Sequence, residues 1–463
     1  MLKPPRLLTP VLIALAGLAA PAAASAEAGG YEPGEVVVRY ARGADQATVE
    51  RAAGIGGAQV VAPRTRVLRI RDGESVAETV RELDARLDVA TAAPNATARI
   101  SAFIPDDPGN TGVRGGWQRL QWNFLAGTGV NAPDAWEHLI KAGQPGGRGV
   151  TVAVLDTGIA YSTRRRYRKS TDFRSADFVS GYDFVDDDRF PHDLNGHGTH
   201  VASTIGESTD NGRGVTGLAY GAQIMPVRVL DKDGAGQSSD ITAGIRFAVR
   251  RGADIINLSF EFDDTYRQFS AEEIPDVLAA VRFAHRQGVV VVGAAGNFGR
   301  KTISFPARAP TVIAVGATTE HGCRANYSNI GIGIDLVAPG GGKDARKDRT
   351  CPRRLPHGRD IYQLTYPWAA LYGASRTASS YRHFGLPSGF EGTSMATPHV
   401  SATAALLLAS GLLGPDPTPE AVLARLQATA TDAGSAGPDD FYGAGRLDAA
   451  GATDPARAGI RAR

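Results

Sequence analysis

Three short segments place an acid, a base and a nucleophile in one order along the chain. Asp156 lies in the segment LDTG, His197 in NGHGTHVA and Ser394 in GTSMATPHV. Taken singly, each has a simpler role, since an Asp after a strand often forms a turn and a Ser before a helix often caps it. Together they supply a hydroxyl nucleophile, an imidazole that removes its proton, and a carboxylate that holds the imidazole in one tautomer. The combination predicts acyl transfer, and the order Asp, His, Ser differs from that of chymotrypsin and of the α/β-hydrolases.

The elements that must position these residues are indicated by the hydrophobic pattern after residue 149. Apolar runs typical of strands buried on both faces lie at residues 150–155, 224–229, 255–258, 289–292 and 312–315. Helical patterns lie at residues 200–205, 239–250, 271–287 and 400–408. Alternating strands and helices predict an α/β fold, a three-layer sandwich whose mostly parallel sheet has helices on both faces. The carboxyl ends of such strands share one edge, where Asp156, His197 and Ser394 would meet.

The three segments resemble the catalytic motifs of the subtilisin family of serine proteases, in particular its thermitase-like, bacterial extracellular branch. AAGN at 294–297 resembles the family's oxyanion-hole segment, and YSN at 327–329 followed by APG at 338–340 resembles its late-strand signature. The likeness covers residues 122–450, and a weaker one covers residues 35–95. The resemblance implies a subtilisin-like fold and a serine endopeptidase that needs no cofactor for catalysis.

The resemblance also assigns a role to each catalytic residue. Ser394 would attack the peptide carbonyl while His197 takes its proton and Asp156 orients His197. The side-chain amide of Asn297 and the backbone N–H of Ser394 would bind the developing oxyanion. In subtilisin itself, loss of one such donor costs about 10²–10³-fold in rate. Without the three motifs, Asn297 would be interpreted as a turn residue after Gly296.

Two backbone stretches are implied as the substrate-binding strands, because extended peptides pair with strands beside the cleft in this family. The matching residues are Gly234, Ala235, Gly236, Leu258, Ser259 and Phe260. The sequence FEF at 260–262 stands where a leucine and two glycines are common. The specificity pocket is therefore expected to be either narrower than is usual in the family or acidic. The sequence does not indicate which substrate side chain is preferred.

An acidic loop precedes His197 and contains Asp183, Asp186 and Asp188. Oxygen ligands gathered on one loop suit Ca²⁺, and the spacing resembles a calcium loop of thermitase-like members. A solvated acidic turn is an equally good interpretation. A bound Ca²⁺ would stabilise the loop and take no part in the chemistry.

The beginning of the chain has the parts of a secretory signal peptide. Lys3 and Arg6 precede an apolar run at residues 11–20, and the small residues ASA follow at 24–26. The run is shorter than the roughly 20 apolar residues that span a bilayer. We therefore predict a signal peptide at residues 1–26, a secreted protein, and no membrane anchor.

Residues 27–105 are predicted to form a propeptide. Strand patterns at 35–40 and 67–70 alternate with helical patterns at 45–53 and 75–87, which fits a small ferredoxin-like α+β module.

The peptidase domain is then predicted at residues 106–463. The resemblance implies that the propeptide is an intramolecular chaperone and inhibitor of this domain. A linker rich in Pro, Asp and Gly joins the two parts, and we predict cleavage between Ile100 and Asn110.

Composition limits other roles. Lys and Arg number 50 against 48 Asp and Glu, a formal net charge of +2, which argues against nucleic-acid binding. The expected partners are protein and peptide substrates, and the protein is expected to be a monomer.

The two cysteines, Cys323 and Cys351, predict a disulfide in an exported protein, with two unpaired thiols as the alternative.

Two other functions fit the same residues. One is a catalytically silent protease homologue that serves as a binding module, and the other is a serine hydrolase acting on esters.

Residues 341–390, the long stretch before Ser394, are expected to be surface loop with a strand at residues 360–365.

Overall fold

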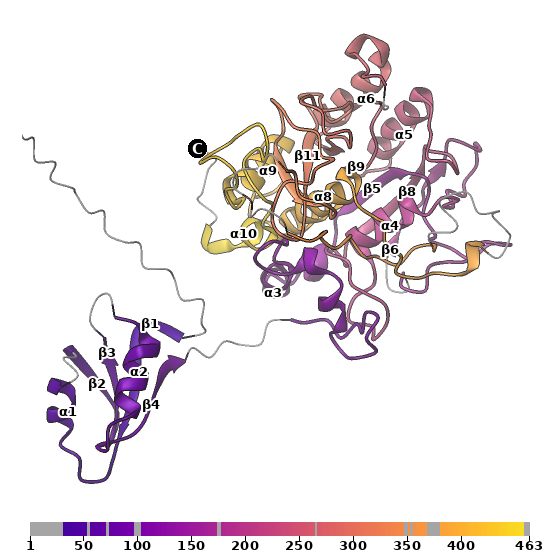
Figure 1. The fold of residues 1–463 in the computed structure, drawn as a ribbon. Helices are drawn as coiled ribbons and strands as arrows, with labels where there is room; N and C mark the ends of the chain where they lie inside the picture. Colours follow the sequence, from indigo (N-terminus) through magenta and orange to yellow (C-terminus); the bar gives the residue numbers. More distant parts are fainter. Residues whose placement is uncertain are drawn as a thin grey trace, which may run out of the picture. The chain divides into compact units, whose positions relative to one another are not determined.

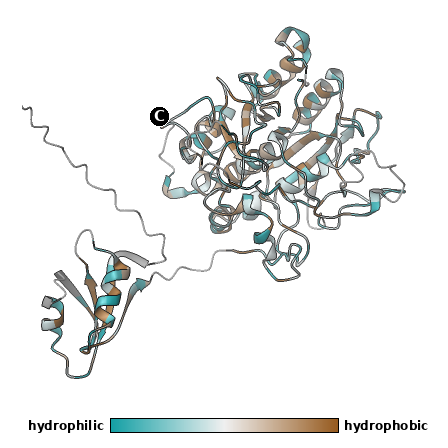
Figure 2. Ribbon diagram, in the orientation of Figure 1, coloured by the Kyte–Doolittle hydropathy of each residue, from teal (hydrophilic) through white to brown (hydrophobic). Residues whose placement is uncertain are grey.

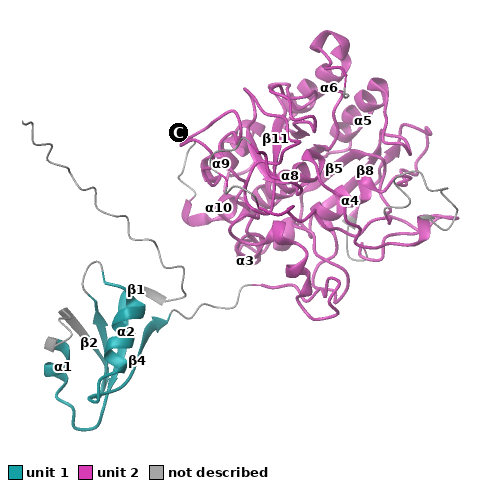
Figure 3. Cartoon of the chain, in the orientation of Figure 1, with its two compact units in different colours: residues 1–101 teal, residues 102–463 magenta. Residues whose placement is uncertain are grey.

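The computed structural model describes the chain in two compact units, residues 1–101 and residues 102–463 (Figure 3). The described residues are 31–52, 56–70, 74–96, 103–173, 177–263, 266–346, 351, 355–367 and 380–457. The predicted signal peptide at residues 1–26 lies outside them. The break between the units falls between residues 101 and 102, and the predicted boundary of the propeptide at residue 105 stays a prediction.

The first unit is a four-stranded antiparallel sheet with two helices. Its elements are β1 (Tyr31–Tyr40), α1 (Gln46–Ala52), β2 (Gly56–Ala62), β3 (Thr65–Arg69), α2 (Val76–Asp84) and β4 (Val89–Ala96), and the strand order is β2-β3-β1-β4. Val36, Val38 and Leu68 from the sheet form its core with Leu83 from α2. The predicted module is confirmed, but strand β2 was missed. It is an edge strand that opens on Gly-Gly and leaves Val60 65% exposed, so it lacks the pattern of a half-buried strand.

The second unit is built on an eight-stranded sheet in which all strand pairs are parallel. Its strands are β5 (Thr151–Asp156), β6 (Asp177–Phe178), β7 (Tyr182–Asp183), β8 (Gln223–Arg228), β9 (Ile255–Leu258), β10 (Val290–Ala294), β11 (Ile313–Thr318) and β12 (Leu336–Pro339). The order is β12-β11-β10-β9-β5-β8-β6, and β7 also pairs with β8. This confirms the predicted sheet and places β5 in its interior (Figure 1).

Helices cover both faces of this sheet. They are α3 (Ala132–Lys141), α4 (His197–Gly206), α5 (Ser238–Arg250), α6 (Pro275–Arg286), α8 (Thr393–Ser410), α9 (Pro419–Thr429) and α10 (Ala449–Thr453). Short 3₁₀ turns lie at Gly116–Arg119, Trp122–Phe124, Pro145–Gly147, Ala271–Glu273, Ser380–Arg382 and Pro455–Arg457. The three-layer α/β architecture is therefore as predicted.

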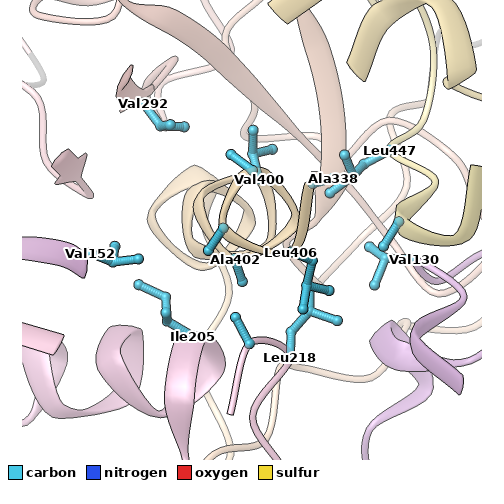
Figure 4. Packing of buried hydrophobic residues seen from close by; sticks show 14 of the residues in the cluster. Val130, Val152, Ile205, Leu218, Val292, Ala338, Val400, Ala402, Leu406 and Leu447 are labelled. Atoms are coloured by element: carbon cyan, nitrogen blue, oxygen red, sulfur yellow. The ribbon is translucent and has the colours of Figure 1, made fainter. Parts of the chain in front are cut away.

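Alternate residues of β5 enter two different hydrophobic cores. Val152 and Val154 pack with α4 and α8 in one core, while Ala153 and Leu155 pack with α5 and α6 in the other. Figure 2 shows the hydrophobic strands at the centre of this unit, and Figure 4 shows α8 surrounded by apolar side chains. Burial on both faces is the reason that these strands have continuous apolar sequences.

Helix boundaries differ from the prediction where local chemistry decides them. The helix predicted at 271–287 begins only at Pro275, because proline has no N–H to donate and disfavours helical geometry in the residue before it. The predicted strand at 360–365 is wrong. Its sequence forms one isolated bridge, between Thr365 and Gly385.

Residues 361–365 instead run over the first turns of α4. Nε2 of His200 contacts the carbonyl oxygen of Ile361 at 3.0 Å, and the hydroxyl of Thr365 donates to the carbonyl of Gly196 at 2.6 Å. The segment thereby fixes the helix that begins at His197.

The predicted disulfide is confirmed, with an S–S distance of 2.06 Å between Cys323 and Cys351. Within the described part of the chain, we find no helix with both the length and the hydrophobicity needed to cross a bilayer.

A buried carboxyl predicts the pH dependence of stability. Asp172 is fully buried, accepts hydrogen bonds from Asn211 and Val215, and lies near Asp107. Burial raises its pKa to about 7. Since the folded state holds this proton more tightly than the unfolded chain, the free energy of unfolding falls as the pH rises from about 4 to about 7.

Replacing Asp172 by Asn should flatten this part of the curve. We expect denaturant midpoints of inhibitor-blocked protein, measured between pH 4 and pH 9 with a chelator present, to change less in Asp172→Asn than in the parent. Asp416→Asn, at an exposed site, is the control. Equal slopes in all three proteins would contradict the assignment.

Candidate active site

Asp156 and His197 form a hydrogen-bonded pair between β5 and α4. Nδ1 of His197 lies 2.8 Å from Oδ1 of Asp156, which also accepts the backbone N–H of Thr157 at 2.7 Å. Asp156 is completely buried, whereas 26% of the His197 side chain is exposed. The carboxylate favours the tautomer with the proton on Nδ1, which leaves Nε2 to act as a base.

Two opposing effects set the pKa of His197. Burial of the imidazole lowers it, but the charge and hydrogen bond of Asp156 raise it by more, and Asp193 adds to the rise. The net result is a raised pKa. The surroundings therefore stabilise the imidazolium that would form when His197 accepts a proton.

Gly198 allows α4 to begin this close to β5. A Cβ atom at this position would lie 2.2 Å from the carbonyl oxygen of Gly158 and 3.1 Å from Oδ1 of Asp156. Any larger residue would push the first turn of α4 away from the strand end. The glycine after His197 therefore serves the geometry of the acid–base pair.

Asp193 organises the loop before His197, and the sequence analysis missed it. Its buried carboxylate accepts hydrogen bonds from Gly196 N at 2.8 Å, Thr199 N at 2.9 Å and the Thr157 hydroxyl at 2.9 Å. It thus joins the end of β5 to the start of α4. An acid just before a helix of glycines and threonines was the available signal.

Asn297 is fixed beside the start of α8. Its Oδ1 accepts the backbone N–H of Thr393 at 2.8 Å and the Thr393 hydroxyl at 3.0 Å. The Asn297 amide and the backbone nitrogen of Ser394 both lie close to Gly392, since a Cβ there would lie 3.5 Å from Oδ1 and 3.8 Å from Nδ2 of Asn297 and 3.6 Å from Ser394 N. An oxyanion hole needs two N–H donors near one point, and this proximity is compatible with that predicted role.

Ser394 is the second residue of α8 and is half-buried. The hydroxyl of Ser259 donates to its carbonyl oxygen at 2.9 Å, so the predicted binding stretch Leu258, Ser259 and Phe260 lies beside the turn that carries Ser394. Helices α4 and α8 pack against each other. The assignments of Ser394 as nucleophile and Asn297 as oxyanion donor stay predictions.

The second predicted binding stretch, Gly234 to Gly236, is a tight loop. Asp231 N donates to the carbonyl of Ala235 at 2.7 Å, and Asn195 links the loop to the His197 segment through the carbonyl of Lys232. Its role in binding substrate stays a prediction.

The acidic loop is organised around an arginine. Nη1 of Arg228 contacts Asp183 at 2.8 Å and Asp186 at 2.6 Å, and Asp188 accepts the backbone N–H of Phe190. A guanidinium thus neutralises two of the three predicted calcium ligands. Ca²⁺ at this loop stays a prediction.

Comparison with known proteins identifies the family. Residues 147–445 match the subtilase family, and residues 18–95 match the fervidolysin N-terminal prodomain. The chain is a subtilase. It is 32% identical to "Thermophilic serine proteinase" of Bacillus sp. strain AK1 over 84% of this chain and 80% of that one, and 36% identical to "Subtilisin BL" of Lederbergia lenta over 66% and 91%.

Among solved structures, a protease from Pseudoalteromonas arctica PAMC 21717 matches 77% of this subtilase and 100% of its own chain, at 30% identity and a TM-score of 0.58. The predicted family, fold and enzyme class are therefore confirmed. This subtilase is a serine protease with an N-terminal prodomain.

Removing the charge of Asp156 should disable the base. We expect Asp156→Asn to lower kcat by about 10⁴-fold, as loss of the triad carboxylate does in related enzymes. Because Asp156 raises the pKa of His197, the acidic limb of the pH–rate profile should move to lower pH. Peptide hydrolysis across pH measures both effects.

The exposed Asp276→Asn on α6 is the matched control and should match the parent enzyme. A loss below tenfold in Asp156→Asn, with an unmoved acidic limb, would contradict the role of Asp156.

Proposed function

We propose that this subtilase is a secreted endopeptidase that cleaves proteins through an acyl-enzyme on Ser394. The observation that carries the proposal is the 2.8 Å hydrogen bond from His197 to the buried Asp156. Asn297, held at the start of α8 by Thr393, supports it. A buried acid, an oriented base and a fixed amide have no simpler joint explanation than acyl transfer.

In the proposed mechanism His197 acts first as a base and then as an acid in each half of the reaction. Nε2 of His197 removes the proton of the Ser394 hydroxyl, whose oxygen attacks the peptide carbonyl carbon. The oxyanion is bound by Nδ2 of Asn297 and the backbone N–H of Ser394. The tetrahedral intermediate collapses as His197 protonates the leaving amine, and water then hydrolyses the acyl-enzyme by the same steps.

We also propose that the protein is made as a zymogen that processes itself. The prodomain match and the separate first unit support an inhibitory propeptide at residues 27–105. A signal peptide at residues 1–26, cleavage between Ile100 and Asn110, a peptidase domain at 106–463, a monomeric mature enzyme and the absence of an anchor belong to the same proposal.

The variant Ser394→Ala should stay uncut. Without the nucleophile the chain cannot cleave its own linker, so the purified variant should keep the mass of the proenzyme and bind no fluorophosphonate. The parent should show a new N-terminus between Ile100 and Asn110, label at Ser394 and degrade casein. Ser239→Ala, at an exposed position of α5, is the control for the serine substitution.

Maturation of pure Ser394→Ala at the parental rate would contradict self-processing. Failure of the parent to label would favour a silent homologue, and turnover of simple esters without casein would favour an esterase.

Ca²⁺ binding by Asp183, Asp186 and Asp188 is proposed as a stabilising feature only. If the ion binds there, Ca²⁺ should raise the unfolding temperature of the blocked parent enzyme and raise that of Asp188→Asn by less. Equal shifts in both proteins would place the effect elsewhere. No shift in either protein would contradict Ca²⁺ binding at this loop, where Asp183 and Asp186 pair with Arg228.

A further inference from the structure

Glu261 lies directly behind the amide that is proposed to bind the oxyanion. Its Oε1 accepts the backbone N–H of Asn297 at 3.0 Å and the Nδ2 of the same residue at 3.2 Å. This glutamate belongs to the FEF sequence that departs from the family pattern. The proposed mechanism does not use it.

A second carboxylate shares a hydroxyl with Glu261. The Oγ of Ser304 lies 2.9 Å from Oε2 of Glu261 and 2.7 Å from Oδ2 of Asp263. This hydroxyl also accepts the Nδ2 of Asn329 at 3.0 Å. Because a serine has one proton to donate, it can satisfy only one of the two acids at a time. Asp263 has further donors in the backbone N–H of Phe269 at 2.9 Å and Nε2 of Gln268 at 3.3 Å, so the shared proton matters most to Oε2 of Glu261.

Of the two acids, Asp263 has a positively charged neighbour and Glu261 has none in the described part of the chain. Arg300 lies 3.5 Å from Asp263, but in the described part of the chain Glu261 forms no ion pair, and its hydrogen-bond partners are the neutral Asn297 and Ser304. Burial, together with the charge of Asp263, raises the pKa of Glu261. A carboxylate held this way gains most from a cation that arrives with a ligand.

The pair lies next to the scissile bond of a substrate bound as proposed. The carbonyl oxygen would be held by Asn297, whose Nδ2 touches Glu261. Ser259, two residues before Glu261, donates to the carbonyl of Ser394. The segment that carries Glu261, which follows β9, therefore runs from the turn that carries Ser394 to Asn297. The side chain on the N-terminal side of the scissile bond branches from the atom next to that carbonyl.

Gly296 makes room for the carboxylate of Glu261. Its φ is +109°, and a Cβ there would lie 2.5 Å from Oε2 of Glu261 and 2.5 Å from Oγ of Ser304. The carboxylate occupies the room that this glycine provides. Glu261 is half-buried, whereas Asp263 is 8% exposed, so only the first is within reach of a ligand.

We propose that Glu261, with Asp263 behind it, selects a lysine or arginine side chain at the residue immediately N-terminal to the scissile bond. The inference rests on the proposed protease function and names its substrate class. An ammonium or guanidinium at this position would replace Asn297 N–H and Ser304 as the main partner of Glu261. A cation paired with a partly buried carboxylate forms the stronger, charge-assisted type of hydrogen bond.

The test uses the mature enzyme and fluorogenic peptides that differ only in this residue. Arg and Lys are compared with norleucine, citrulline, Leu, Phe and Ala. We expect kcat/KM for Arg or Lys to exceed that for the uncharged isosteres by about tenfold or more, as a charge-assisted contact supplies. The Arg-to-norleucine ratio should fall at least tenfold in Glu261→Gln and by less in Asp263→Asn.

The ratio of kcat/KM for the Arg peptide to that for the norleucine peptide shows whether Glu261 selects the substrate or only positions Asn297. If Glu261 only positions Asn297, Glu261→Gln lowers kcat for every peptide alike and leaves the ratio unchanged, which would overturn the proposal. Highest turnover of the Ala peptide would mean that Glu261 fills the pocket, which would overturn it as well. Exposed Glu272→Gln is the matched control and should keep the parental ratio.

Failure of this inference is distinguishable from failure of the protease function. Fluorophosphonate labelling of Ser394 and degradation of casein do not depend on a basic residue being preferred. A labelled, active enzyme that prefers Leu or Phe would reject the specificity and keep the function.

Discussion

The proposed active site depends on one hydrogen bond between two elements that are distant in sequence. Asp156 ends a strand in the interior of the sheet, and His197 begins a helix that packs against it. The acid has no exposure to solvent and the base is partly exposed. The buried carboxylate orients the imidazole and raises its pKa, while the imidazole side chain keeps partial exposure. Catalysis, on this account, begins with how closely α4 can approach β5.

The rest of the unit maintains that approach. Gly198 has no side chain that would separate the helix from the strand. The buried carboxylate of Asp193 accepts hydrogen bonds from Thr157, after the strand, and from Thr199, in the helix. Residues 361–365 hold the same helix from outside through His200 and Gly196. On the neighbouring helix, Thr393 fixes Asn297 at the turn that carries Ser394. Each contact restrains a group by hydrogen bonds or close packing before any substrate arrives, which is the condition for electrostatic preorganisation.

The fold could be predicted from the sequence because burial on both faces gives the strands continuous apolar runs. The motifs could be recognised because glycines cluster where a helix must start near a strand. It missed Asp193, since a buried acid that bonds backbone N–H groups has no periodic signature. It missed the pairing of Glu261 with Asp263 and Ser304, because these residues meet only through the fold. It predicted calcium ligands at Asp183 and Asp186 without foreseeing that Arg228, from β8, contacts both.

The most direct test of the central claim is a crystal structure of the mature enzyme bound to a peptide aldehyde. The account predicts a covalent bond from the aldehyde carbon to Oγ of Ser394. The new oxygen should lie within hydrogen-bond distance of Nδ2 of Asn297 or Nε2 of His197, with Nδ1 of His197 still bonded to Asp156. An aldehyde carbon attached to any other residue, or an imidazole turned away from Ser394, would contradict it.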